Sequence, residues 1–488
     1  MIADNQWAPP PGASRPRNRR RVLVAMASSL ALLAGAALAG SLVFDAVPQY
    51  PERWDPRVVE LATFVEDHRG LTFKHPVHVY FLTPDEYSNV TSGGIAAGEP
   101  SEEDQQNSRD STAEYRALGL MEGEPDLLEA GQTMADAGTL AFYSPVDDVV
   151  NVRGTEMTVG LQVTLAHELT HALQDQYFDL TVIGDSPSQD ESGAVRAVVE
   201  GDAVTTENAY IDTLSSDDQN AYYDEIGNAQ TDAAEELDDV PDVLQVLFGS
   251  YYAVGNAFVG FWQATPNADD DPGQLDEVLA DPPTSSAQVF DPNAYIAGDP
   301  PAEVEVPESG DERFEWSSFG ADFLFVMLAE RIDPLLALQA TDGWRGDSYE
   351  AVFDETTVRR ICVHANVELA SFDDAREFHD AISAWADDMP SAANTAADDP
   401  DGTMVGFTSC DPGADADMGL TGQAGDALGY PVARLQIAAG AVTGGSSRAD
   451  ALCYANAVIE QLSLDDIMAN ESTPAIDSAI ESANEACP

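Results

Sequence analysis

Lysine is almost missing from this chain. Lys74 is the only lysine among 488 residues, and Lys and Arg together number 21 against 87 Asp and Glu, for a formal net charge of −66. No basic stripe follows the N-terminal segment, which argues against nucleic-acid binding. Hydrophobic residues make up 44% of the chain, enough for sizeable cores, so the charge does not indicate disorder. We interpret the acidity as a solvated surface suited to very high salt, with calcium binding or a cationic substrate as alternatives.

Cysteine is also scarce. The four cysteines all lie in the last third of the chain, and none forms C-x-x-C, which argues against a zinc ribbon: Cys362, Cys410, Cys453 and Cys487. An even number in an external domain predicts two disulfides with three possible pairings, and four reduced thiols are the alternative. The chain has no internal repeat, P-loop, Rossmann glycine pattern or nucleophile elbow.

The N-terminus predicts a membrane segment. Residues 1–21 are rich in proline and arginine, and residues 22–44 carry no charge and are long enough to span a bilayer as one helix. The arginines before this run predict a cytoplasmic tail, with the rest of the chain extracytoplasmic. A signal peptide cleaved after Ala37-Leu38-Ala39, which would release a secreted protein, is the alternative.

The most specific chemical motif is H-E-x-x-H at His167-Glu168-Leu169-Thr170-His171, within a helical pattern over residues 158–174. Residues four apart share one helix face, so His167 and His171 can bind one Zn²⁺ ion together. Glu168 lies one step round the helix, where it can take a proton from an activated water. The alternative is a buried helix with two hydrogen-bonded histidines.

A catalytic zinc site usually has a third protein ligand and one open position. A histidine six residues after His171, with a glycine at the third, is excluded because Tyr177 and Gln174 occupy those positions. Asp175 and Glu200 remain as candidates. We favour Glu200, because a carboxylate directly after two valines suits a buried metal better than a solvated helix face.

Three further residues are candidates for roles around the metal. Asp202 is predicted to orient a zinc-binding histidine through its free ring nitrogen. Glu207 is interpreted as a surface residue or as a partner of a ligand. The hydroxyl of Tyr252, or of its neighbour Tyr251, is a candidate donor to the oxyanion formed during hydrolysis, and aromatic packing is the alternative.

A predicted β-hairpin directly precedes the metal helix. Residues 139–143 and 149–153 are β-rich, and residues 144–148 supply the turn. The free edge of such a hairpin can pair with an extended peptide and hold it over the metal, which favours a peptide or protein substrate. A purely structural hairpin is compatible with the same pattern.

Two stretches resemble an uncharacterised family of gluzincin-type predicted zinc metallopeptidases from haloarchaea and actinobacteria. The first runs from Ala141 to Leu180, and the second is Glu200-Gly201-Asp202-Ala203. Shorter blocks extend the resemblance over most of residues 70–488: 252–255, 258–259, 281–285, 343–347 and 409–413. The resemblance implies a zinc-dependent peptidase, and the acidic composition is similar to that of halophilic archaeal proteins. One departure is Asp291-Pro292, where such proteins often carry His-Pro.

Together these observations predict an α+β fold. We expect a zincin-like catalytic domain over residues 49–345, with a small mixed sheet, an active-site helix and then mainly helices. A helical, cysteine-containing cap is expected over 346–488, and one transmembrane helix is expected before the catalytic domain.

The predicted function is a membrane-anchored zinc metallopeptidase, in which His167, His171 and Glu200 bind Zn²⁺ and Glu168 is the base. The alternative is a zinc-stabilised surface or binding module without proteolytic activity, which the departure at Asp291 favours. A third possibility is a solute- or cell-wall-binding protein in which the motif is accidental.

Overall fold

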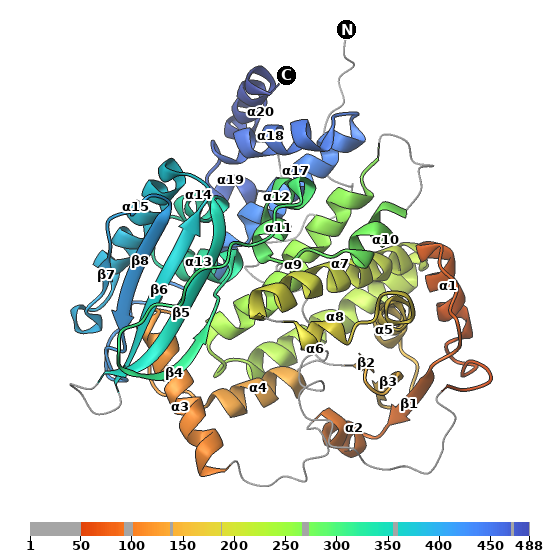
Figure 1. The fold of residues 1–488 in the computed structure, drawn as a ribbon. Helices are drawn as coiled ribbons and strands as arrows, with labels where there is room; N and C mark the ends of the chain where they lie inside the picture. Colours follow the sequence, from red (N-terminus) through yellow and green to blue (C-terminus); the bar gives the residue numbers. More distant parts are fainter. Residues whose placement is uncertain are drawn as a thin grey trace.

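The computed structural model describes residues 50–91, 101–136, 140–186, 188–265, 273–354, 360–469 and 473–487. Helices dominate, and the strands form two separate sheets (Figure 1). The α+β class is therefore confirmed. Beyond the elements introduced below, the described residues form α2 (Pro84–Thr91), α3 (Glu102–Ala117), α4 (Leu127–Asp136), α6 (Val182–Asp185), α10 (Gly273–Ala280), α12 (Pro292–Ala297), α16 (Ala424–Ala427), α19 (Leu464–Ile467) and a 3₁₀ turn at Ser391–Ala393.

A small mixed sheet packs against the motif helix. Its order is β1 (His78–Leu82), β3 (Val149–Arg153), β2 (Ala141–Ser144), with β1 parallel and β2 antiparallel to β3. One face packs on α1 (Val59–Arg69) and α5 (Val159–Phe178) through a shared apolar core. The predicted hairpin is confirmed, and β2 is an edge strand of this sheet.

Two long helices run next to each other through the centre of the molecule, α7 (Gln189–Thr213) and α9 (Asp242–Gln263) (Figure 1). They approach closely where two glycines meet. A Cβ atom on Gly201 would lie 2.3 Å from the carbonyl oxygen of Gly255, and one on Gly255 would lie 2.0 Å from that of Ala197. Only glycine allows this approach. The contact brings the Glu200 turn of α7 against α9.

The second half contains a five-stranded antiparallel sheet that the sequence did not predict. Its order is β4 (Glu312–Ser317), β5 (Trp344–Asp354), β6 (Arg360–Leu369), β8 (Met404–Cys410), β7 (Ala396–Ala397). The expected boundary between residues 345 and 346 falls inside β5. The region 346–488 is therefore not a separate helical cap, because its strands belong to the same sheet as β4.

Strand β5 escaped prediction because polar residues occupy its buried positions, which removes the apolar alternation of a strand. Asp347 is buried and accepts hydrogen bonds from the backbone N–H groups of Phe319 and Gly320. Glu350 is buried too and accepts one from the N–H of Ser309. Such partners offset the desolvation of the carboxylates but leave no pattern in the local sequence.

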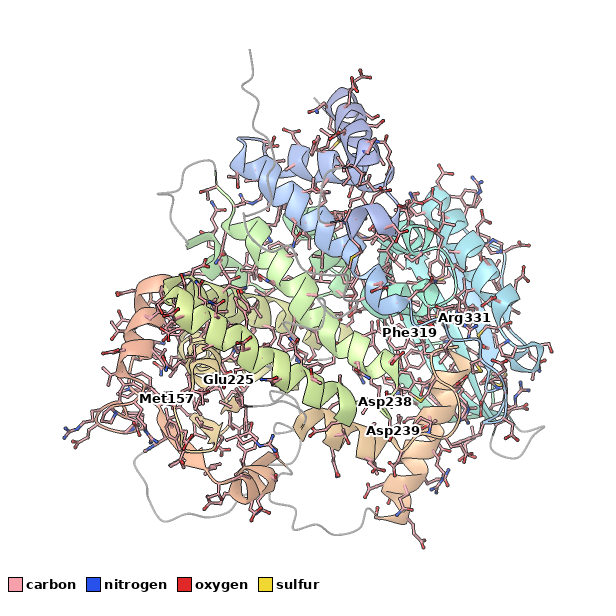
Figure 2. The ribbon with its side chains drawn as sticks, turned by 180° about the vertical axis from the view of Figure 1, so that it is seen from behind. Met157, Glu225, Asp238, Asp239, Phe319 and Arg331 are labelled. Carbon is pink, nitrogen blue, oxygen red and sulfur yellow. A yellow bond between two sulfur atoms is a disulfide. The ribbon has the colours of Figure 1, made fainter. Side chains whose placement is uncertain are left out.

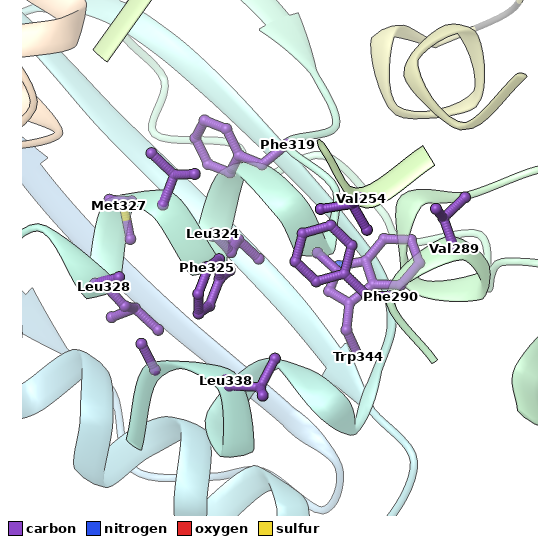
Figure 3. Packing of buried hydrophobic residues seen from close by; sticks show 14 of the residues in the cluster. Val254, Val289, Phe290, Phe319, Leu324, Phe325, Met327, Leu328, Leu338 and Trp344 are labelled. Atoms are coloured by element: carbon purple, nitrogen blue, oxygen red, sulfur yellow. The ribbon is translucent and has the colours of Figure 1, made fainter. Parts of the chain in front are cut away.

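The larger core lies between this sheet and the central helices. Helix α13 (Ala321–Ala329) runs through it and contacts side chains from α9, from α11 (Ser286–Phe290) and from α14 (Pro334–Asp342) (Figure 3). The buried side chains of α13 and its neighbours include Val254, Val289, Phe290, Leu324, Phe325, Leu328 and Leu338. Because α9 also packs on α7, this core supports one side of the motif region.

The C-terminal third adds helices and two disulfides. Helices α15 (Phe372–Asp388), α17 (Gly429–Thr443) and α18 (Arg448–Ile459) pack on the larger core, and α20 (Pro474–Ala486) packs on α18. Two disulfides are confirmed, and the structure resolves the open pairing: Cys362 with Cys410 between adjacent strands, and Cys453 with Cys487 between α18 and the end of α20.

The predicted membrane segment at residues 22–44 and the tail at 1–21 lie outside the described residues. Among the described helices, α9 alone is long and apolar enough to cross a membrane by length and composition. Half of its apolar window is buried in the protein. Its packing against α7 accounts for its hydrophobicity as that of a core helix.

Candidate metal centre

Helix α5 presents the motif from a well-anchored position. Thr158 caps its beginning, and Glu225 of α8 (Ser216–Glu236) accepts a hydrogen bond from the N–H of Gly160 at 3.0 Å. Figure 2 shows Glu225 close to Met157, just before the helix begins. One side of α5 is apolar and packs on the small sheet, which leaves the two motif histidines facing α7.

Three ligand atoms converge between α5 and α7. The Nε2 atoms of His167 and His171 lie 3.0 Å apart, and Oε2 of Glu200 lies 3.3 Å and 3.5 Å from them. All three residues are fully buried. Ligands at about 2.0–2.1 Å from a tetrahedral zinc are themselves roughly 3.3 Å apart, so the set fits that ion with one position left open. The structure thus brings together the three predicted ligands.

The outer hydrogen bonds of both imidazoles leave the inner nitrogens free to bind metal. Nδ1 of His167 lies 3.2 Å from Oε2 of Glu207, and Nδ1 of His171 lies 2.9 Å from Oε1 of Gln174. The Gln174 amide nitrogen donates to the Val199 carbonyl, so its oxygen must face His171. Both acceptors place a hydrogen on Nδ1. Once both rings are neutral, they direct two Nε2 lone pairs at the Glu200 carboxylate, an arrangement that a cation stabilises.

The protein groups themselves favour positive charge at this centre. Burial lowers the pKa of His167, but hydrogen bonds to Glu200 and Glu207 outweigh it and raise the pKa to about 10. Burial raises the pKa of Glu200, but His171 and His167 outweigh it and lower the pKa to about 2. The surroundings therefore hold either a proton on His167 or a metal cation in its place.

Glu168 lies beside the ligands in a state suited to proton transfer. Its carboxylate is buried and accepts a hydrogen bond from the backbone N–H of Tyr143, on edge strand β2, at 2.8 Å. Burial raises its pKa, the two motif histidines lower it, and the net value is about 7. A general base works best when its pKa is near the operating pH. The role of Glu168 as the base stays a prediction.

Asp202 does not have the predicted direct contact with a histidine. Within the described chain its carboxylate pairs with Arg69 at 2.8 Å and accepts from the Gln174 amide at 2.7 Å. Gln174 in turn bonds His171. Asp202 does not reach the ring of His171, because Gln174, which lies on α5 itself, bonds both side chains. Asp202 therefore acts on the ligand through Gln174.

Tyr252 lies at the centre, as predicted. Its side chain is buried, and burial and the carboxylates of Glu200 and Glu168 raise its pKa well above the usual value. The hydroxyl therefore stays protonated and can donate a hydrogen bond.

Asp175, the other candidate for the third ligand, accepts hydrogen bonds from the Tyr143 hydroxyl and from the Leu180 N–H.

Asp291 has a local structural role. It caps α12 by accepting a hydrogen bond from the N–H of Asn293. It also interacts electrostatically with Arg434 and Asp342, which form an ion pair in which only the arginine is buried. Asp291 is therefore integrated into the C-terminal core, and the departure from His-Pro is accommodated there.

No family model, curated protein or solved structure matches this chain. The resemblance found in the sequence therefore remains a prediction. Metal binding is inferred from the geometry of the centre itself.

Sequence reasoning misses one outer part of the centre, Gln174, although its position three residues after His171 places it on the same helix face. Glu207 is predicted to be either a surface residue or a partner of a ligand. It is buried and bonded to His167 and to the hydroxyl of Tyr222, which agrees with the second alternative. Its position seven residues after Glu200, two turns along one face of α7, was the available signal.

Replacing Gln174 with methionine should weaken zinc binding. The side chain keeps a similar volume, but the Nδ1 hydrogen of His171 loses its acceptor, and loss of such an outer partner typically reduces metal affinity by about 10–100-fold. Competition with a chromophoric chelator measures this affinity. Gln162→Met is the control, because Gln162 lies on the same helix and bonds Tyr210 instead. Equal affinities of both variants would contradict the role of Gln174.

Proposed function

We propose that this protein is a zinc-dependent metallopeptidase that cleaves peptide bonds within other proteins or peptides. The supporting observation is the convergence of the ligand atoms of His167, His171 and Glu200, with the Glu168 carboxylate at their side. Two histidines and one glutamate match a known catalytic ligand set, in which water or substrate takes the fourth position. A zincin-like arrangement of sheet, helix and centre is part of the proposal.

The residues of the chain divide the proposed reaction between them. A bound Zn²⁺ ion supplies Lewis acidity, which activates water and polarises a carbonyl group. Glu168 accepts the proton of the attacking water and passes it to the amine nitrogen when the C–N bond breaks. The protonated hydroxyl of Tyr252 donates a hydrogen bond to the developing oxyanion.

A peptide substrate is favoured by the position of edge strand β2. Its residue Tyr143 bonds Glu168 through the backbone N–H, so the strand runs alongside the proposed base. Within the part of the chain that the structure describes, one edge of β2 has no partner strand. An extended peptide paired with this edge would lie beside the metal ligands.

We further propose that the protein acts outside the cytoplasm, anchored by residues 22–44, with secretion after signal cleavage as the alternative. Two disulfides within the described chain support this location, because such bonds persist in oxidising surroundings. The net charge of −66 argues for action on peptides in concentrated salt rather than on nucleic acid.

A second function is favoured by one observation. All three ligands are fully buried, and closed sites are typical of structural zinc. The second candidate is therefore a zinc-stabilised surface or binding module without peptidase activity.

A cleavage assay in molar salt separates the two functions. The chain is incubated with peptides of randomised sequence, its zinc content is measured, and the products are identified by mass spectrometry. We expect one zinc per chain and cleavage that stops with a chelator and returns with zinc. Stoichiometric zinc without cleavage would favour the binding module, and a chain without zinc would refute both.

A further inference from the structure

Basic residues are few in this chain, and its buried arginines are consistently bonded. Arg69 pairs with Asp202 and Asp276, Arg116 pairs with Asp411, and Arg434 pairs with Asp342. Other arginines that are at least half-buried donate to carboxylates or backbone carbonyls: Arg331, Arg345, Arg360 and Arg448. This pattern is expected, because desolvated charge needs a partner.

Arg196 is the exception. It is half-buried on α7, and within the described chain no carboxylate or carbonyl accepts a hydrogen bond from its guanidinium. Its guanidinium lies over the ring of Tyr251, whose centroid is 5.4 Å from Cζ. Since acidic residues outnumber basic ones by 87 to 21, an arginine without an acidic partner is unusual here.

The position of Arg196 connects it to the metal centre. It precedes Glu200 by four residues, so both side chains lie on one face of α7, one turn apart. Its charge acts on Glu200 and on the hydroxyls of Tyr251 and Tyr252. The ligands are fully buried, whereas Arg196 and Tyr251 are partly exposed. Arg196 therefore lies one helical turn from a ligand of the metal centre, with part of its own side chain exposed to solvent.

We propose that Arg196 binds a carboxylate of the peptide substrate and so selects peptides that carry one next to the bond that is cut. The inference rests on the proposed peptidase function and names its substrate class. A guanidinium donates two parallel hydrogen bonds to a carboxylate, a pairing that is stronger and more directional than contact with a neutral amide. The carboxylate belongs either to the C-terminus of the peptide or to an Asp or Glu side chain.

The acidic, salt-screened surface explains why Arg196 alone is enough to select peptides with a carboxylate. A chain with a charge of −66 repels anionic peptides at low ionic strength, but molar salt screens charges beyond about 3 Å. In molar salt, only a short and partly buried contact can distinguish a peptide that carries a carboxylate from one that does not. Arg196 has that burial, and its guanidinium lies over the Tyr251 ring, within the range of a cation–π contact.

Binding to the Glu168→Gln chain tests the proposal without any turnover. The immobilised, zinc-loaded chain is exposed in molar salt to two acetylated peptide pools of randomised sequence that differ only in a C-terminal carboxylate or amide. Mass spectrometry measures the retained peptides. We expect about 10–100-fold enrichment, either of free carboxylates over amides or of Asp and Glu within the amidated pool. Which enrichment appears identifies the source of the carboxylate.

Substitutions assign the preference to Arg196. In the same background, Arg196→Gln should abolish the enrichment, and Arg196→Lys should keep part of it because charge remains without the planar pair of donors. The control is Arg376→Gln, which removes an exposed arginine on α15. Equal retention of all peptides, no retention, or an enrichment that survives Arg196→Gln would overturn the proposal. If the cleavage assay fails but the enrichment depends on Arg196, the carboxylate site stands and the peptidase function does not.

Discussion

Replacing Glu168 with glutamine is expected to reduce peptide-bond hydrolysis by about 10²–10⁴-fold, while one zinc ion per chain stays bound. Glutamine has nearly the same shape, and its amide oxygen can still accept the hydrogen bond from the Tyr143 N–H. It cannot accept a proton from water. The ligands His167, His171 and Glu200 are unchanged, so the loss falls on kcat rather than on metal content.

Single-turnover cleavage and metal analysis of the same preparation measure the two parts of this prediction. Glu350→Gln is the matched control, because Glu350 is also a buried glutamate but lies in the second sheet, bonded to Ser309 and Arg313. Its variant should cleave at the rate of the natural chain. Cleavage by Glu168→Gln within a few-fold of that rate would refute the proposed base.

The inner part of the centre was predictable because it depends on local geometry. Two histidines four residues apart on a helix must share a face, whatever the rest of the chain does. Glu200 stood out because a carboxylate follows two valines, and those valines are buried in the larger core. Such predictions need only a few neighbouring residues and no knowledge of the tertiary structure.

The outer part of the centre depends on how helices meet. The packing of α7 against α5 decides which side chain bonds His171. Gln174 lies on α5 and bonds the ring, whereas Asp202 lies on α7 and bonds the Gln174 amide. The approach of α9 to α7 depends on two glycines far apart in sequence, Gly201 and Gly255. The second sheet was missed for a similar reason, since the partners of Asp347 and Glu350 come from other segments.

Replacing Glu200 with glutamine is expected to remove the stabilisation that zinc gives to the fold. A ligand that binds only the native state stabilises it by RT ln(1 + [L]/Kd), about 2.7 kcal/mol at one hundred times Kd. The neutral amide no longer balances the cation between His167 and His171, so the affinity should fall by more than the roughly 10–100-fold expected for an outer partner. Thermal unfolding with excess zinc and with chelator measures the difference, which should vanish in the variant.

The matched control for this prediction is Glu207→Gln, which makes the same change on the same helix but affects His167 only through Nδ1. It should keep a zinc-dependent rise in Tm, reached at higher zinc concentration.

Zinc binding by the natural chain should also strengthen as pH rises, because His167, with its pKa raised to about 10, must release a proton to bind metal. If the histidines were only a hydrogen-bonded pair in the core, zinc would leave the Tm of the natural chain unchanged. Glu200→Gln would then destabilise the protein whether or not zinc was present, because the buried charge on His167 would lose its partner.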